Sequence, residues 1–225
     1  MQRNLFFLFV ALLMASCTGP DVLNLFVGTY SDGFYAYDLD QRAGKFIGEG
    51  PVAKAEMPNP SYLTVLGNKV YAVSEMPDTR ASVWAWRWGG NGFELLNSQP
   101  TGLPDQGEDP CYVSTDGTFL AVANYSGGTL ATYRLRGDGS IAPLDSLLVS
   151  GIGGPDLSRQ EAPHVHCAIF SPEGKHLFFS EFSADEIGRL DVYTGESGTI
   201  AARRPCIPTT APGTCCSTLP VSTCT

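Results

Sequence analysis

The fold is decided by one motif that occurs three times: Asn59-Pro-Ser-Tyr-Leu-Thr-Val65, Asp109-Pro-Cys-Tyr-Val-Ser-Thr115 and Ala162-Pro-His-Val-His-Cys-Ala168. The prolines of the three copies recur at intervals of 50 and 53 residues. Each copy is followed by a second apolar stretch, at 69–75, 118–124 and 175–181. A period near 50 residues made only of strands is typical of β-propeller blades, each of which is a four-stranded sheet.

The unit that begins at Asn59 displays one blade most clearly. Val83-Trp-Ala-Trp-Arg-Trp88 alternates in the way expected of a strand, and Gly67-Asn68 suits a hairpin turn. The strands predicted for this unit are 61–66, 69–75, 82–88 and 93–98.

The segment before the first motif predicts a shorter blade. It contains apolar stretches at 23–30, 34–38 and 45–48, and no proline-led strand precedes them. We therefore predict an all-β chain with about four propeller blades in residues 21–194, the first of which lacks its inner strand.

The composition agrees with this fold and excludes one class of partner. The chain is 43% hydrophobic and 16% charged, and its 25 glycines and 16 prolines favour short strands joined by turns. The net charge of −9 argues against a nucleic-acid surface, which needs a clustered basic face. An anionic substrate would need local arginines.

Residues 1–20 have the pattern of an export signal and linker. Arg3 precedes an apolar run at 5–15 that is too short to span a bilayer, and Leu-Met-Ala-Ser comes directly before Cys17. This resembles a bacterial lipobox, so we expect an exported lipoprotein in the periplasm or outer membrane, anchored to the membrane through lipid on Cys17. The alternative is an ordinary secretory signal in which Cys17 is incidental.

Residues 195–225 lack both strand alternation and blade motifs. Their richness in Cys, Pro and Thr predicts an irregular tail, either out of frame or disordered. Its cysteines have no paired C-x-x-C spacing, so we expect no metal site, while disulfides remain open. These cysteines are Cys206, Cys215, Cys216 and Cys224.

Candidate site residues gather where first strands begin and second strands end, because both points meet at one mouth of a propeller channel. The third copy of the motif carries two histidines. Aligned on the prolines, His164 replaces Ser61 and Cys111, and His166 replaces Leu63 and Val113. We expect both imidazoles on one strand face, with His166 the deeper.

His164 and Arg159 are the predicted catalytic residues. A histidine can take a proton from water or give one to a leaving alkoxide, although a structural histidine at a strand end is the alternative. The Arg159 guanidinium, on the loop before the histidine strand, could hold an anionic sugar; a solvated loop charge is the alternative.

Five further residues are predicted to bind substrate, and for each the alternative is a purely structural role. His166 could support His164, and Asn124 could bind sugar hydroxyls or simply serve a turn. Glu75 and Glu181, which we expect at equivalent strand ends of different blades, could act as paired carboxylates. Asp185 could contact substrate or occupy a turn.

Several stretches together resemble the propeller-type 6-phosphogluconolactonase family, which also includes fungal muconate-lactonising enzymes. The likeness runs in order from about residue 24 to 193. It is carried by Phe26-Val-Gly-Thr-Tyr, Asn59-Pro-Ser-Tyr-Leu, Val70-Tyr-Ala-Val-Ser-Glu, Leu96-Asn-Ser-Gln, Asp109-Pro-Cys-Tyr-Val, Val122-Ala-Asn-Tyr-Ser-Gly-Gly and Arg159-Gln to Pro163-His-Val-His.

The resemblance implies a seven-bladed lactonase propeller, truncated here to about four blades, that hydrolyses a sugar lactone at the channel mouth. It implies no required cofactor, a monomer once the ring is complete, and roles for Arg159 and His164. One departure is Glu181-Phe-Ser-Ala-Asp185, where the family has an aspartate-leucine-glycine turn. The alternative function is a non-catalytic exported propeller that binds a protein or glycan.

Overall fold

The protein is all-β in the part that the computed structural model describes, which is residues 21–149, 154–183, 186–192 and 200–201. These residues form four antiparallel four-stranded sheets. The first contains β1 (Val22–Val27), β2 (Gly33–Asp40), β3 (Lys45–Ile47) and β4 (Ala53–Glu56). The second contains β5 (Leu63–Leu66), β6 (Lys69–Ser74), β7 (Ser82–Trp88) and β8 (Phe93–Pro100).

The third and fourth sheets repeat the order of the second. The third contains β9 (Pro110–Thr115), β10 (Phe119–Asn124), β11 (Thr129–Leu135) and β12 (Ile141–Val149). The fourth contains β13 (Val165–Phe170), β14 (His176–Glu181), β15 (Glu186–Val192) and β16 (Ile200–Ala201). In each of these three sheets the strands pair in chain order, as propeller blades do.

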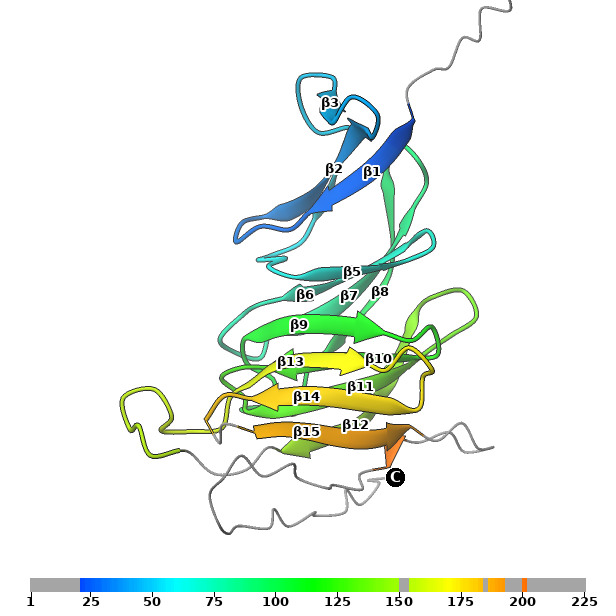
Figure 1. Ribbon diagram of the computed structural model, residues 1–225. Helices are drawn as coiled ribbons and strands as arrows, with labels where there is room; N and C mark the ends of the chain where they lie inside the picture. Colours follow the sequence, from blue (N-terminus) through cyan, green and yellow to red (C-terminus); the bar gives the residue numbers. More distant parts are fainter. Residues whose placement is uncertain (1–20, 150–153, 184–185, 193–199, 202–225) are drawn as a thin grey trace, which may run out of the picture.

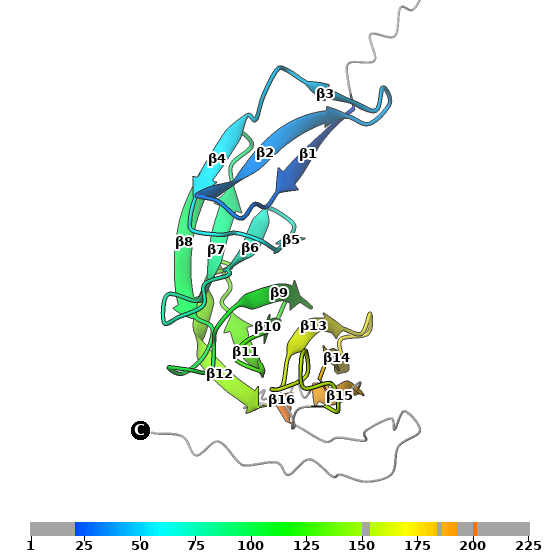
Figure 2. The same cartoon turned by 90° about the vertical axis from the view of Figure 1, so that its left-hand side faces the viewer.

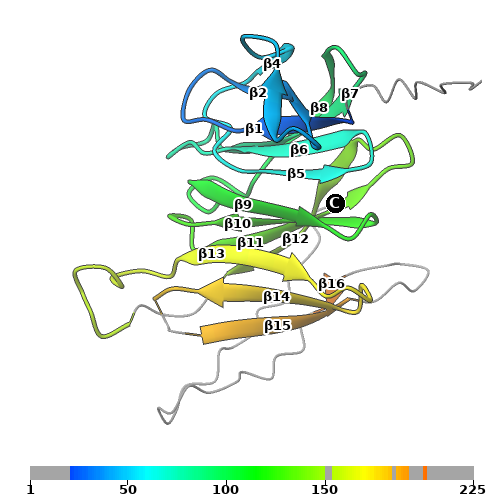
Figure 3. The ribbon, with the colours of Figure 1, turned by 45° about the horizontal axis from the view of Figure 1, so that its top comes forward.

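The sheets fan out along an arc. In Figure 2 the strands β4, β8 and β12 follow its convex side, whereas β5, β9 and β13 lie on its concave side. Consecutive sheets touch through these same strands: β5 contacts β9, β9 contacts β13, and β8 contacts both β4 and β12. The proline-led strands therefore line the inside of the arc, as predicted, and Figure 3 shows them stacked in succession.

The hydrophobic core lies between neighbouring blades, in three clusters that each join two sheets. All six residues of β10 are buried, because this strand is inside its sheet and a neighbouring blade covers each face. A strand buried on both faces is apolar throughout and loses the alternation of a half-exposed strand. Phe119-Leu-Ala-Val-Ala123 has this pattern, and the last residue of the strand, Asn124, is buried and polar.

The first blade is incomplete in the way that the sequence predicts. Among the described residues β1 pairs only with β2, and β3 and β4 pair with different halves of the other β2 edge. The strand β4 was not predicted, because Ala53-Lys-Ala-Glu56 is poor in β-branched and aromatic residues and forms a strand by pairing with β2.

Parts of the predicted organisation lie outside the described residues. These include the signal segment with Cys17, the predicted site residue Asp185 and most of the tail. The two-residue strand β16 does fall within 195–225, where an irregular tail was predicted, and it pairs with β15. In the described ranges no helix has the length and apolar character needed to cross a membrane.

Candidate functional site

The hydrogen-bonded register corrects the alignment of the two histidines with the sister blades. In the third blade Pro110 pairs with Asn124, and in the fourth Val165 pairs with Glu181. Both pairs stand directly before a bulge. His166 therefore occupies the place of Cys111, not of Val113 as the proline alignment predicted.

The backbone hydrogen bonds next to these two pairs show which residue of the third blade is equivalent to His164. The amide of Tyr125 donates to the Asp109 carbonyl (2.9 Å), and that of Phe182 donates to the His164 carbonyl (2.8 Å). His164 thus replaces Asp109, two positions from the predicted equivalence with Cys111. The proline alignment was wrong because the two prolines stand at different places relative to their strands. Pro163 precedes β13, whereas Pro110 is the first residue of β9 and pairs with Asn124 of β10. The hydrogen bonds between strands define the register.

His164 is held in one ring orientation by the neighbouring blade. It lies just before β13 and is 7% exposed. Its Nδ1 is 2.9 Å from the Tyr125 carbonyl oxygen, and its ring stacks on that of Tyr125 at 4.2 Å with an interplanar angle of 4°. Because a carbonyl only accepts hydrogen bonds, Nδ1 carries the proton in the neutral ring and Nε2 keeps its lone pair.

Glu181 supports the backbone at His164. Its carboxylate is 3% exposed, and Oε1 accepts the amide hydrogens of His164 (2.7 Å) and Ser183 (3.0 Å). Charge-assisted bonds of this kind hold a chain segment firmly. By register Glu181 matches Ser74 and Asn124, so its predicted equivalence to Glu75, which matches Phe182, was wrong.

His166 is the exposed member of the histidine pair, contrary to the prediction that it is the deeper one. It is the extra residue of the bulge in β13, which interrupts the alternation of buried and exposed side chains. Its ring meets Tyr125 edge-on, with centroids 5.8 Å apart. Both histidines therefore contact the same tyrosine.

Arg159 lies close to the histidine strand, as predicted. It is exposed, and its guanidinium carbon is 5.1 Å from the ring centroid of Phe182, whose amide binds the His164 carbonyl. The loop that carries Arg159 is fastened by Gln160, which is 7% exposed and donates from Nε2 to the Phe182 carbonyl (3.2 Å). Arg159 thus contacts the ring of Phe182, whose backbone is hydrogen-bonded to that of His164.

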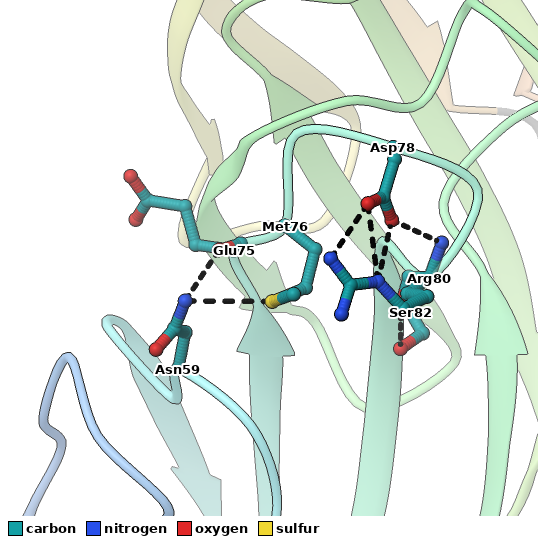
Figure 4. A network of polar contacts seen from close by, with 6 residues as sticks. All are labelled: Asn59, Glu75, Met76, Asp78, Arg80 and Ser82. Atoms are coloured by element: carbon teal, nitrogen blue, oxygen red, sulfur yellow. Dashed lines mark hydrogen bonds and ion pairs between the residues drawn. The ribbon is translucent and has the colours of Figure 1, made fainter.

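Glu75 stands half-buried directly after β6. Figure 4 shows its carboxylate pointing away from Met76 and from the Asp78–Arg80 ion pair (2.6 Å). The carboxylate Oε1 accepts a long hydrogen bond of 3.5 Å from the exposed hydroxyl of Tyr30. The second blade therefore presents an acid, and the loop after β1 of the first blade presents a phenol, at the same end of the sheets that carries His164 in the fourth.

Asn124 is fully buried at the end of β10. Its Nδ2 donates to the carbonyl of Thr101 (2.7 Å) and to the hydroxyl of Thr129 (2.9 Å). The side-chain amide thus binds the residue after β8 and the first residue of β11, which is the structural role given as the alternative for this residue. The predicted contacts of all the candidate residues with substrate remain predictions.

Tyr125 is the residue that sequence reasoning missed. It follows Asn124 in the Asn-Tyr-Ser-Gly-Gly stretch, whose pattern predicts no role for the tyrosine. Its contact with His164 joins residues 39 positions apart. No local sequence pattern indicates such a contact. The signal that could have found it is the position of Tyr125 directly after a second strand, at the predicted channel mouth where the histidine strand begins.

Cys111 occupies the place that His166 has in the next blade, and it provides a test of this packing. Burial, reinforced by the Glu75 carboxylate, raises the pKa of the thiol from 9.0 to about 12. Between these values only the unfolded chain loses the proton, so unfolding becomes more favourable as the pH rises. We expect Cys111 to contribute a loss of at most about 1.4 kcal/mol per pH unit above pH 9.

Urea unfolding at pH 8 and pH 10.5 would measure this contribution. The Cys111→Ala variant should lose less stability than wild type between the two pH values. Equal losses in wild type and Cys111→Ala would contradict the burial of the thiol beside Glu75.

No group of three or more His, Cys, Asp or Glu side chains could hold a metal ion within the ranges that the structure describes. The chemistry that these ranges offer is an oriented imidazole, a nearby guanidinium and a half-buried carboxylate.

Comparisons with known proteins agree with the propeller fold. The family described as "Lactonase, 7-bladed beta-propeller" matches residues 24–214. A 6-phosphogluconolactonase of Bacillus subtilis is 34% identical over 187 residues, which are 77% of this chain and 51% of the relative. The chain spans about half the length of the curated relatives it matches.

Solved structures give the same picture. A putative 6-phosphogluconolactonase from Bacteroides uniformis is 39% identical with a TM-score of 0.74, over 82% of this chain and 54% of the other. A periplasmic gluconolactonase of Pseudomonas aeruginosa is 28% identical with a TM-score of 0.71, over 83% of this chain and 56% of the other.

Proposed function

Because this chain belongs to the lactonase family of seven-bladed β-propellers, we propose that it hydrolyses a sugar lactone. The observation that carries the proposal is the orientation of His164, whose Nδ1 is bound to the Tyr125 carbonyl so that Nε2 keeps a lone pair. The first substrate to test is 6-phosphogluconolactone, which gives 6-phosphogluconate, because relatives from Bacillus subtilis and Bacteroides uniformis bear that activity in their names.

In the proposed reaction His164 acts first as a base and then as an acid. Nε2 takes a proton from water while the water oxygen attacks the lactone carbonyl and forms a tetrahedral intermediate. The bond between the carbonyl carbon and the ring oxygen then breaks, and the imidazolium returns the proton to the leaving alkoxide. The product is an open-chain hydroxy acid, with one water consumed.

In this proposal Arg159 holds the anionic end of the substrate. It is exposed, and no carboxylate forms an ion pair with it among the described residues. Its guanidinium carbon lies 5.1 Å from the ring centroid of Phe182, whose backbone amide binds the His164 carbonyl. An arginine fork binds carboxylate or phosphate through two parallel hydrogen bonds.

We expect Arg159→Gln to raise KM for a phosphorylated lactone about tenfold or more, since a hydrogen bond to a charged group contributes about 1.5–3 kcal/mol. KM for a neutral gluconolactone should change much less, because that substrate has no anionic end. Initial rates of acid release for both lactones would measure the difference.

The matched control for Arg159→Gln is Arg80→Gln, which removes an exposed arginine that is already paired with Asp78. This control should leave both KM values near wild type. Equal effects of Arg159→Gln on the two lactones would refute its role as an anion clamp. Binding without hydrolysis of any lactone by the full gene product would favour a non-catalytic binding propeller.

Export through the lipobox-like segment at Cys17 remains part of the proposal. A lactonase outside the cytoplasm would meet sugar lactones other than one formed inside the cell. One structural relative, from Pseudomonas aeruginosa, is described as a periplasmic gluconolactonase. A neutral gluconolactone is therefore the second substrate to assay.

A further inference from the structure

We propose that Tyr125 is the positioning residue of the site, and that its ring and carbonyl together hold His164 in a single tautomer and a single orientation. The catalytic meaning of this role rests on the proposed function, whereas the tautomer itself can be observed whether or not the chain hydrolyses a lactone. Three features of the third and fourth blades lead to the proposal.

The first feature is that the contact crosses from one blade to the next. Tyr125 follows β10 of the third blade, and His164 precedes β13 of the fourth. The positions equivalent to His164 in the second and third blades hold Asn59 and Asp109, both with the positive φ angles of tight turns. Where its sisters have short turn residues, the fourth blade places an imidazole long enough to reach the neighbouring tyrosine.

The second feature is the rigidity of the turn that presents the carbonyl. The Tyr125 carbonyl also accepts the amide hydrogen of Gly128 (3.2 Å), which closes the turn. Gly128 has φ of +61°, and a Cβ added there would lie 2.7 Å from the Pro163 carbonyl oxygen. A Cβ on Gly127 would lie 2.6 Å from the Gln106 carbonyl oxygen. Backbone on both sides thus confines the turn, and only glycine fits at these two places.

The third feature is that the tyrosine ring restricts both histidines. It stacks on His164 almost in parallel and meets the His166 ring at 85°. To exchange its two nitrogens, the His164 ring would have to rotate against the stacked phenol face while breaking the bond to the carbonyl. Without that ring, the same carbonyl would face an imidazole free to flip.

The test is ¹⁵N NMR of the imidazole rings in the 225-residue chain, which contains three histidines and so gives a simple spectrum. At a pH where the ring is neutral, long-range ¹H–¹⁵N correlations distinguish the protonated nitrogen from the bare one. We expect His164 to be protonated at Nδ1 alone in wild type and in Tyr125→Phe, and to give averaged signals from both tautomers in Tyr125→Leu.

His176 is the internal control for this experiment. Its Nδ1 is 3.0 Å from Asp191 Oδ1, at the far end of β14 from Glu181, so its signals should not change in either variant. Unchanged His176 signals also show that the fourth blade remains folded in Tyr125→Leu. If that blade is lost, Gly128→Ala provides a second disturbance of the same turn with the tyrosine intact, and it should also cause His164 averaging.

Two results would overturn the proposal: a wild-type His164 protonated at Nε2 or averaged, or a Tyr125→Leu variant in which His164 keeps one tautomer. In an active protein, turnover should fall about tenfold in Tyr125→Leu and stay within about twofold in Tyr125→Phe. A failure of the proposed function would give a different result. In that case His164→Ala would retain full activity, although the wild-type His164 would still be protonated at Nδ1 alone.

Discussion

Replacing His164 by alanine should lower the rate of lactone hydrolysis at least about a hundredfold, because general acid–base groups contribute about 10²–10⁴-fold. The imidazole is the side chain that supplies both proton transfers in the proposed reaction. Tyr125 binds it through a carbonyl, and Glu181 uses one oxygen on two backbone amides. The rate should be measured as acid release in the longest protein that the gene encodes.

The matched control for this prediction is His176→Ala. His176 is also in the fourth blade, but it starts β14 at the end away from the candidate site and binds Asp191. Its loss should change the hydrolysis rate less than about twofold. If His164→Ala kept the wild-type rate with an unaltered fold, the catalytic role of His164 would be refuted.

Replacing Tyr133 by alanine should lower the free energy of unfolding by about 3–5 kcal/mol, the range observed when large buried aromatic side chains are truncated. Tyr133 lies on β11, is fully buried, and belongs to the cluster that joins the second and third blades. Its hydroxyl donates to the Pro100 carbonyl (2.7 Å) at the end of β8. The alanine variant would lose packing and the hydrogen bond together.

Two further variants separate these contributions. Tyr133→Phe keeps the ring and should cost about 1–2 kcal/mol, because it leaves the Pro100 carbonyl without its partner. Tyr30→Ala removes a tyrosine that is 74% exposed and should change stability by less than about 0.5 kcal/mol. Urea unfolding would measure all three variants, and equal effects of Tyr133→Ala and Tyr30→Ala would contradict the described core.

Much of the fold could be predicted because it depends on sequence patterns that extend over only a few residues. The alternation in 82–88 and the proline-led repeats gave strands that the structure confirms, with ends that differ by a few residues. The strand β4 could not be predicted in this way, because Ala53-Lys-Ala-Glu56 becomes a strand only by pairing with β2. Its conformation comes from a neighbour, not from its own residue types.

The candidate site was predicted less well. Arg159 and His164 both contact Phe182, Arg159 through its guanidinium and His164 through its backbone carbonyl, and their roles in catalysis stay predictions. The relative depth of His164 and His166 was predicted the wrong way round, because the bulge at His166 changes which side chains are buried. Tyr125 was missed altogether, because its role depends on a contact between blades.

The amino-acid sequence alone determined that this protein is built from repeated four-stranded units and that one unit carries two imidazoles, because strand alternation and turn residues act over a few positions. Only the tertiary structure decided that His164 matches Asp109 and that Tyr125 is its partner. Register is defined by hydrogen bonds between separate strands, and the meeting of two blades depends on packing between segments far apart in the chain.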